Sequence, residues 1–342
     1  MTIASLIARA AETFPLTPTE IEAACNLLLD EAQPVDQRAA FLGALHRRGE
    51  TPDEIASFVD LLLQHAVRFP ASGAGCIDVC GTGGDKAGFF NISTATMFVA
   101  AGAGARVIKH GNRGITSKSG GADVLEALGV NIALTPDQAA SALEKSRCCF
   151  LFAPAWHPAF KAVAPVRKFL ADQGSASIFN MIGPLLNPAR PDYQLAGVFD
   201  PSLVQTYAGA FKTLGRKRAW AAHGTGPDGL RLDEISPLGK TQVTAWEEGV
   251  MRSFEINPAD FGVTSPSRED LLGGDATRNA EIITSILTGK NKSTARQAVL
   301  LNAAAALTIS GNAPTLQEAY HLATESIECG KAIRVLEKLR VD

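Results

Sequence analysis

The sequence predicts an α/β fold with a small N-terminal helical domain and a large domain built on a central, mostly parallel sheet. Two observations support this. Residues 1–68 carry helical patterns only, whereas from about residue 73 short strand-like runs alternate with helical segments. Such alternation is typical of a parallel sheet covered by helices. With 342 residues, 46% of them hydrophobic, the chain can bury a substantial core, and we predict domains at 1–68 and 73–342.

The first domain contains three segments with apolar residues at helical spacing: TPTEIEAACNLLLDEA (17–32), PVDQRAAFLGALHRRGE (34–50) and TPDEIASFVDLLLQHAV (51–67). The last of these has an unusually apolar face at residues 61–63. Packing in the core or against another subunit would both explain that face, and we favour the core.

The second domain contains five strand-like runs: CIDVC (76–80), RVIKH (106–110), CCFLFAP (148–154), QLAGVFD (194–200) and RAWAAHG (218–224). Helical patterns separate several of these runs, as in ADVLEALG (122–129) and SLVQTYAGAFKTLG (202–215). From about Ala276 to the end, long helical patterns return.

Composition excludes several classes of protein. The longest apolar run, Ala95 to Ala105, is too short to span a bilayer, and the N-terminus lacks the pattern of an export signal, so we predict a cytoplasmic protein without a membrane segment. A net charge of −3 gives no basic field for nucleic acid. The cysteines show no paired spacing, and we predict that all are small buried hydrophobes: Cys25, Cys76, Cys80, Cys148, Cys149 and Cys329.

The stretch GTGGDKAGFFNIST, residues 81–94, follows the first strand and leads into a helix that we expect to begin near Ser93 or Thr94. A dinucleotide fingerprint is absent, because Lys86 stands where its last glycine belongs, and the GKT at 239–241 lacks the first glycine of a Walker loop. Glycine clusters more often form turns than bind phosphate. The polar helix start nevertheless favours an anion site at the carboxyl end of a strand.

A second polar loop, within KHGNRGITSKSGGADVLEALG (109–129), follows the next strand. It combines cations with hydroxyl groups: Lys109, Arg113, Lys118, Thr116, Ser117 and Ser119. Solvent exposure is the usual explanation for such polarity. Two donor-rich loops at neighbouring strand ends favour a site for a ligand with several phosphate groups.

The order of motifs GTGGD, NIST, KHGNR, SKSG and VLEALG resembles the anthranilate phosphoribosyltransferase family. The similarity continues through HPAFKAVAPVR, IFNMIGPLLNPA, HGTGPDGLRLDEIS, DFG and LLNAAAAL, so it covers nearly the whole chain. The resemblance implies transfer of a phosphoribosyl group from phosphoribosyl pyrophosphate to the amine of anthranilate, in tryptophan biosynthesis. It also implies a nucleoside phosphorylase/phosphoribosyltransferase-like fold, Mg²⁺ as cofactor, two ions in all, and a homodimer. A helix around 157–172 would return to the helical domain, with the ligand cleft between the domains.

The family's functional residues match positions in this chain. The resemblance implies a phosphoribosyl pyrophosphate site at Gly81, Gly84, Asp85, Asn91, Ser93, Thr94, Lys109, Gly111, Asn112, Arg113 and Ser117. It implies an anthranilate site at Gly81, His110, Asn112 and Arg167, and magnesium ligands at Ser93, Asp233 and Glu234. The chemistry agrees, because carboxylates suit hard cations and a planar guanidinium suits a carboxylate. No covalent nucleophile is implied, so positioning and stabilisation of the leaving group would carry catalysis.

Three departures from the family pattern affect the expected site. Phe89 stands where a threonine is expected, Gly121 where the second loop often has a serine, and residues 171–177 (ADQGSAS) form a longer segment without the usual arginine. Two alternatives remain: a related phosphoribosyltransferase or nucleoside phosphorylase with another acceptor, and a non-catalytic homologue that binds nucleic acid through the basic loop, for which strongly salt-dependent DNA binding would be required.

Overall fold

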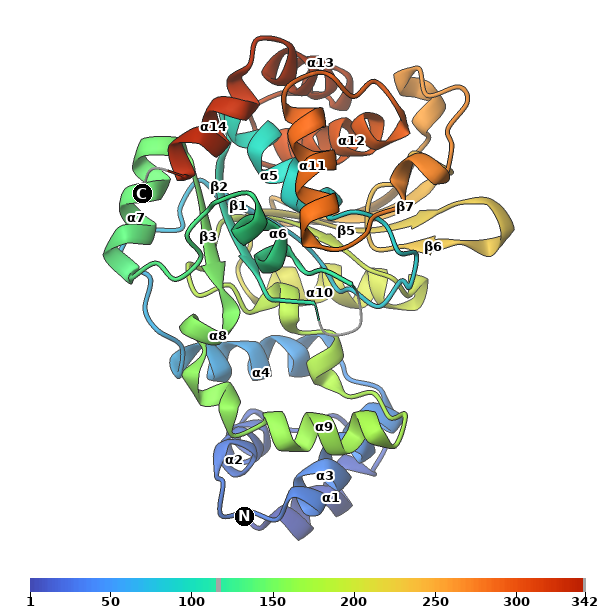
Figure 1. Cartoon of the computed structure of the whole chain (residues 1–342). Coiled ribbons are helices and arrows are strands. Elements are labelled where there is room, and N and C mark those ends of the chain that lie inside the picture. The colour runs from blue at the N-terminus through green and yellow to red at the C-terminus, as the bar shows by residue number, and fades with distance from the viewer. Residues whose placement is uncertain (115–117, 341–342) are drawn as a thin grey trace.

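The computed structural model describes residues 1–114 and 118–340, and its centre is an eight-stranded sheet (Figure 1). The strands follow the order β3-β2-β1-β4-β5-β7-β8, and β6 pairs with β5 off this path. The run from β3 to β5 is parallel, whereas β6, β7 and β8 are antiparallel to their neighbours, so the prediction of a mostly parallel sheet is confirmed. The strands are β1 (Cys76–Gly81), β2 (Arg106–Gly111), β3 (Cys148–Phe152), β4 (Tyr193–Gly197), β5 (Arg218–Thr225), β6 (Arg231–Leu232), β7 (Thr241–Glu247) and β8 (Val250–Ile256).

One face of the sheet packs against a layer of helices that includes most of the C-terminal part of the chain (Figure 1). Helix α5 is buried along nearly its whole length between the sheet and helices α12, α13 and α14. The helices on this side are α5 (Ile92–Gly102), α6 (Gly121–Ala127), α7 (Pro136–Ser146), α11 (Ala276–Leu287), α12 (Thr294–Ile309), α13 (Leu316–Glu328) and α14 (Lys331–Leu339).

The opposite face packs against α10 (Val204–Thr213) and the N-terminal helices, which lie below the sheet in Figure 1. Strand alternation separates the two layers: Ala219 and Ala221 of β5 join this second core, whereas Trp220 between them joins the first. The N-terminal helices are α1 (Ile3–Ala10), α2 (Pro18–Leu29), α3 (Val35–Arg48) and α4 (Pro52–Gln64). Because the second core runs without a break from these helices into the sheet, the boundary between 1–68 and 73–342 stays a prediction.

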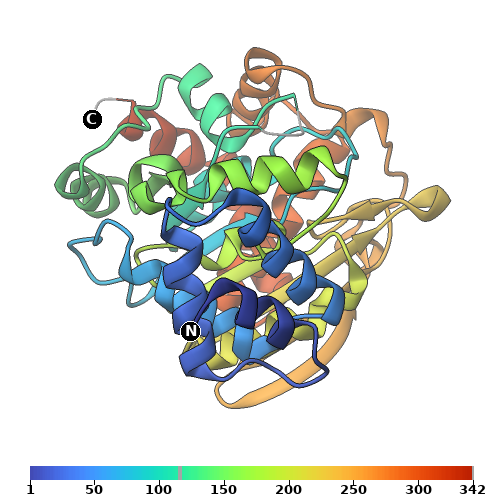
Figure 2. The ribbon, with the colours of Figure 1, turned by 90° about the horizontal axis from the view of Figure 1, so that it is seen from below.

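The segment after β3 returns to the N-terminal helices, and Figure 2 shows it beside them from below. It begins with the short helix α8 (Ala153–Trp156), continues as a 3-10 turn (Pro158–Lys161) and ends in α9 (Ala164–Asp172), which packs on α3. Buried Arg38 of α3 fixes the connection, because its guanidinium donates hydrogen bonds to the carbonyls of Leu28 (3.1 Å) and Ala162 (2.9 Å).

Several sequence-based expectations differ from the structure in detail. Residues 157–172 do not form one helix, since prolines stand near the start of both the 3-10 turn and α9. The hairpin of β7 and β8 was not predicted. Leu62 and Leu63 are buried in the core, as favoured.

The prediction of six buried cysteines is wrong for two of them. Cys80 is half-buried at the end of β1, and Cys329 is exposed because it caps the surface end of α13. None of the helices in the described ranges combines the length and apolar character that crossing a bilayer requires.

Candidate active site

The segment Asp233–Glu234 follows β6 and crosses the carboxyl ends of three neighbouring strands. Each of these strands has a glycine at the position where the segment crosses it. A Cβ atom on Gly81 of β1 would lie 2.2 Å from the Asp233 carboxylate, one on Gly197 of β4 would lie 1.6 Å from the Asp233 carbonyl oxygen, and one on Gly224 of β5 would lie 2.4 Å from that of Glu234. The backbones therefore approach as closely as they do only because these positions lack side chains.

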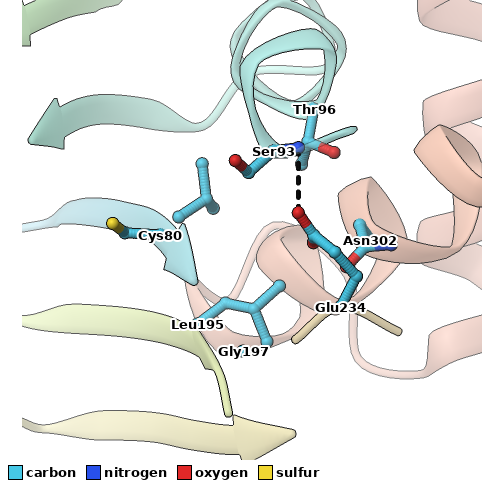
Figure 3. Close-up of a pocket in the computed structure, with 8 residues that line it drawn as sticks. Cys80, Ser93, Thr96, Leu195, Gly197, Glu234 and Asn302 are labelled. Carbon is cyan, nitrogen blue, oxygen red and sulfur yellow. Dashed lines mark hydrogen bonds between the residues drawn. The ribbon is translucent and has the colours of Figure 1, made fainter. Parts of the chain in front are cut away.

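Both carboxylates of this segment are held by backbone amides. The amide of Gly83 donates to Asp233 (2.7 Å), and the amide of Ser93, in the first turn of α5, donates to Glu234 (3.2 Å; Figure 3). Burial, with the nearby Asp85, raises the pKa of Asp233 to about 7. Burial and the neighbouring Asp233 raise the pKa of Glu234 well above its usual value. The pair is thus a concentration of negative charge that the protein neutralises only in part.

Lys109 lies near this acidic pair. Its ammonium is buried and donates hydrogen bonds to the carbonyl of Val79 and to Oγ of Ser93 (3.1 Å). Its charge opposes the rise in the pKa of Glu234. Lys109 therefore holds the Ser93 hydroxyl by a hydrogen bond and contributes positive charge to the site.

The donor set fits a divalent cation. Two half-buried carboxylates with raised pKa values and a serine hydroxyl offer oxygen ligands without a paired guanidinium or ammonium between them. In the described part of the chain no three side chains of His, Cys, Asp or Glu form a metal cluster. Magnesium commonly binds through one or two carboxylates together with phosphate oxygens of a substrate, which is the arrangement that these residues allow.

The glycine loop contacts the pair through the amide of Gly83. Gly83 and Gly84 have positive φ angles of 72° and 89°, so the loop needs glycine there, and both residues are exposed. Phe89, one of the departures, forms an isolated bridge with Leu272 and packs its ring against the core. It therefore fastens the far end of the loop.

The helix after the loop begins at Ile92, one residue before the predicted start, with Asn91 as its cap residue. Asn91 donates to the carbonyl of Ser119 (3.2 Å) and accepts from Asn279 of α11 (2.9 Å), so it joins both loops to a third element. The buried hydroxyl of Thr94 has no hydrogen-bond partner within residues 1–114 and 118–340. A Cβ on Gly121 would lie 3.2 Å from that hydroxyl, so the second departure leaves space beside Thr94.

The second loop is organised by acidic residues of α6. The Asp123 carboxylate accepts from the amides of Gly114 and Gly120, both at 2.9 Å. Arg113 is exposed and pairs with Asp123 and Glu126, so its charge is already balanced. Asn112 is exposed, Gly111 ends β2 against the ring of Phe150, and Ser117 lies outside the described residues.

Two buried histidines connect β2 with the segment that leads to α9. The ring of His110 meets the ring of His157 edge to face at 5.1 Å, and His157 stacks on Phe160 at 4.9 Å. Burial, together with His157, lowers the pKa of His110 to about 3, and burial lowers that of His157 to about 4, so both rings are neutral. Arg167 extends from α9 as an exposed side chain, with no ion pair to a carboxylate in the described residues.

Sequence reasoning missed three residues that build this site. Gly197 and Gly224 make room for the acidic segment, and Asn302 of α12 accepts a hydrogen bond from the backbone amide of Ile235, the residue that follows this segment. Gly197 and Gly224 lie inside strand-like runs, where glycine is unfavourable and commonly marks a close backbone approach. A polar residue within the apolar run LLNAAAAL was the corresponding signal for Asn302.

Comparison with known proteins shows which family the chain belongs to. Residues 4–66 match the model of the glycosyl transferase family, helical bundle domain, and residues 73–333 match that of the glycosyl transferase family, a/b domain. The anthranilate phosphoribosyltransferase of Syntrophomonas wolfei is 44% identical over 324 residues, which cover 95% of this chain and 93% of the relative.

Solved structures of the same enzyme superpose along nearly the whole chain. The enzyme of Thermus thermophilus has a TM-score of 0.88 at 35% identity and 98% coverage of both chains. The Saccharomyces cerevisiae enzyme in complex with phosphoribosyl pyrophosphate and Mg has a TM-score of 0.84 at 28% identity, covering 98% of this chain and 97% of that one. It has also been solved in complex with 4-fluoroanthranilate. With both domain models and relatives of full length in agreement, the chain belongs to the anthranilate phosphoribosyltransferase family.

Proposed function

We propose that the protein transfers the phosphoribosyl group of phosphoribosyl pyrophosphate to the amine of anthranilate, giving N-(5-phosphoribosyl)anthranilate and pyrophosphate, as a step of tryptophan biosynthesis. The observation that carries the proposal is the half-buried pair Asp233–Glu234, held between a glycine loop and the first turn of α5. With a divalent cation held by the pair, such a site would suit a polyanionic leaving group better than a neutral one.

The glycine loop and the start of α5 would bind the pyrophosphate. Amides of the loop, together with the positive end of the dipole of α5, favour an anion at this place. The residues that we assign to phosphoribosyl pyrophosphate are Gly81, Gly84, Asp85, Asn91, Ser93, Thr94, Lys109, Gly111, Asn112, Arg113 and Ser117. For Arg113 this role requires that it leave its ion pairs with α6 or act through them.

Asp233, Glu234 and Ser93 would hold magnesium, with two ions as the fuller proposal. Magnesium bound there would neutralise the charge that builds on pyrophosphate as its bond to C1 breaks. Lys109 would orient Ser93 through their hydrogen bond and add a fixed positive charge.

Anthranilate would bind across the cleft, between the end of β2 and α9. Arg167 would pair with its carboxylate, assisted by Asn112, His110 and the backbone of Gly81. The neutral rings of His110 and His157 would form an uncharged aromatic wall beside the aromatic acceptor. Closure of the helical domain over the site would exclude water, which could otherwise attack C1.

The first test follows the loss of anthranilate fluorescence on addition of phosphoribosyl pyrophosphate and magnesium. We expect magnesium-dependent turnover by the unmodified protein. Arg167→Ala should raise the KM for anthranilate by about tenfold or more and leave that for phosphoribosyl pyrophosphate nearly unchanged, because a charge-assisted hydrogen bond is lost. Lys168→Ala is the matched control, since Lys168 is the next residue of α9 and pairs only with Asp172 in the described structure.

Equal effects of the two substitutions would remove the assignment of Arg167. No turnover of anthranilate would instead favour a related transferase or nucleoside phosphorylase, and assays with other acceptors and with phosphate plus nucleosides would identify it. The nucleic-acid alternative is disfavoured by the ion pairs of Arg113. A homodimer and a cytoplasmic location complete the proposal, with light scattering as the measure of the former.

A further inference from the structure

Asn302 is a buried polar residue in the middle of an otherwise apolar helix. It lies in α12 among alanines and leucines, and its residue is 1% exposed. Its side-chain oxygen accepts a hydrogen bond from the amide of Ile235 (3.0 Å), and its side-chain nitrogen donates to the carbonyls of Ile235 (2.9 Å) and Ala298 (2.9 Å). The side-chain amide of Asn302 therefore forms hydrogen bonds with both the N–H and the carbonyl of Ile235, the residue that follows Glu234.

This contact replaces a strand partner that the acidic segment lacks. Strand β6 ends at Leu232, so the backbone beyond it is no longer paired with β5. An asparagine side chain offers an acceptor and donors at the spacing of a peptide group, whereas an aspartate could not donate and an apolar residue could do neither. Burying such a group in an apolar helix is unfavourable unless it is fully paired, as it is here.

A small cavity lies beside Glu234, so the support from Asn302 matters for the position of this carboxylate. The cavity has a volume of about 10 Å³ and is lined by residues that include Cys80, Ser93, Thr96, Glu234 and Asn302 (Figure 3). The Thr96 hydroxyl on its wall is buried and has no hydrogen-bond partner in the described residues. The Glu234 side chain is thus not enclosed by close packing. Its position depends on the Ser93 amide at one end and on the backbone of its own segment at the other.

We propose that Asn302 is a positioning residue for the acidic pair: by fixing the Ile235 peptide, it holds Glu234 where the carboxylate can share a divalent cation with the phosphates of the substrate. The inference rests on the proposed function. It extends that function to a residue of α12 that would touch neither substrate nor cation.

The test compares Asn302→Ala with Leu301→Ala. Leu301 is the preceding residue of α12, equally buried, and without a hydrogen bond from its side chain, so its substitution destabilises the same helix without releasing Ile235. Binding of Mn²⁺, as a probe for Mg²⁺, is measured by the paramagnetic resonance of the free ion with saturating phosphoribosyl pyrophosphate and no anthranilate. Hydrogen exchange of residues 231–236 is measured without any ligand.

We expect Asn302→Ala to weaken Mn²⁺ binding about tenfold, the usual size of effect for a residue that orients a metal ligand, and to accelerate exchange at Ile235. Leu301→Ala should lower the melting temperature but change neither Mn²⁺ binding nor the exchange rate at Ile235. If Asn302→Ala does not fold, Asn302→Ser, which keeps one hydrogen-bonding group, is measured instead.

Unchanged Mn²⁺ binding in an Asn302 variant that is merely less stable would overturn the proposal, because the asparagine would then serve folding alone. So would an unmodified protein that binds no Mn²⁺ with phosphoribosyl pyrophosphate. If binding occurs and weakens as expected but anthranilate is not consumed, the assigned reaction fails while the role of Asn302 stands.

Discussion

At the scale of single residues, the environment of a side chain decides its charge. His157 donates from Nε2 to the carbonyl of Leu186 (2.9 Å), and its other ring nitrogen has no partner in the described residues. Protonating that nitrogen would place a positive charge in a buried site beside a second histidine. This is why the pKa of His157 falls to about 4.

The lowered pKa predicts an acid-dependent loss of stability. A histidine whose folded pKa of about 4 lies below its unfolded value of 6.5 stabilises the fold fully above about pH 6.5, and this contribution is lost as the pH falls towards 4. The full contribution of His157 to the free energy of unfolding is about 3 kcal/mol. The buried carboxyl of Asp78, with a pKa raised to about 6, acts in the opposite direction, so total stability is not a sufficient measure.

The measurement is urea unfolding from pH 7 to 4 of the unmodified protein and of His157→Gln, which keeps a donor for Leu186. We expect the stability advantage of the unmodified protein over the variant to shrink by about 3 kcal/mol across that range. His65→Gln, at the exposed end of α4, is the control. Parallel curves for His157→Gln and the unmodified protein would show that His157 is not held neutral.

At the scale of elements, the carboxyl edge of the sheet is shaped by where strands carry glycine. Gly81, Gly197 and Gly224 lie on the adjacent strands β1, β4 and β5, and together they form the surface on which the acidic segment rests. Register makes this alignment possible, because Gly81 pairs directly with Gly197 and the pair lies at the ends of their strands. A methyl group on any of them would lift the segment away from the sheet.

Gly197→Ala tests this arrangement. Its Cβ would meet the Asp233 carbonyl oxygen at 1.6 Å, a contact that only a backbone shift can relieve, and overpacking of this kind costs about 1–3 kcal/mol. We expect a folded protein with a rate at least about tenfold lower, because the displaced pair can no longer meet the phosphates. Gly43→Ala in α3, where the added methyl would meet only the flexible end of Arg47, should leave the rate unchanged. Unaltered kinetics in Gly197→Ala would show that the segment tolerates displacement.

At the scale of the whole molecule, the site joins parts of the chain that are far apart in sequence. The glycine loop, the basic loop, the acidic segment and α12 meet at one edge of the sheet, and α9 returns to the N-terminal helices on the opposite side (Figure 1). A ligand that contacts several of these segments must stabilise the native state against unfolding.

Phosphoribosyl pyrophosphate with magnesium should therefore raise the melting temperature by a few degrees, since a hundredfold excess over the dissociation constant adds about 2.7 kcal/mol. Ribose 5-phosphate with magnesium should have a smaller effect, because it lacks the pyrophosphate. Asp233→Asn should abolish the shift, whereas Asp228→Asn, in the turn before β6, should preserve it. Scanning calorimetry measures the melting temperature for both ligands and both variants. Equal shifts with phosphoribosyl pyrophosphate and with ribose 5-phosphate would place binding outside the acidic pair.

Local patterns in the sequence were sufficient for most of the secondary structure. Threonine-proline caps such as those before Glu20 and Glu54 form hydrogen bonds within a few residues, so they mark helix starts wherever the chain folds. Each of the five strand runs and the polar loops after β1 and β2 were likewise visible, because burial on both faces and glycine-rich turns leave direct traces in composition. The motif order also identified the family.

Other features depended on contacts between distant segments. The hairpin of β7 and β8, the break before α9, the ion pairs that occupy Arg113 and the exposure of Cys329 are not encoded in any short window of sequence. The clearest case is the acidic pair: an Asp-Glu dipeptide is ordinarily a solvated surface feature. Three glycines on separate strands, the amide of Ser93 and the side chain of Asn302 make it a half-buried anionic site, and only the folded chain brings those five residues together.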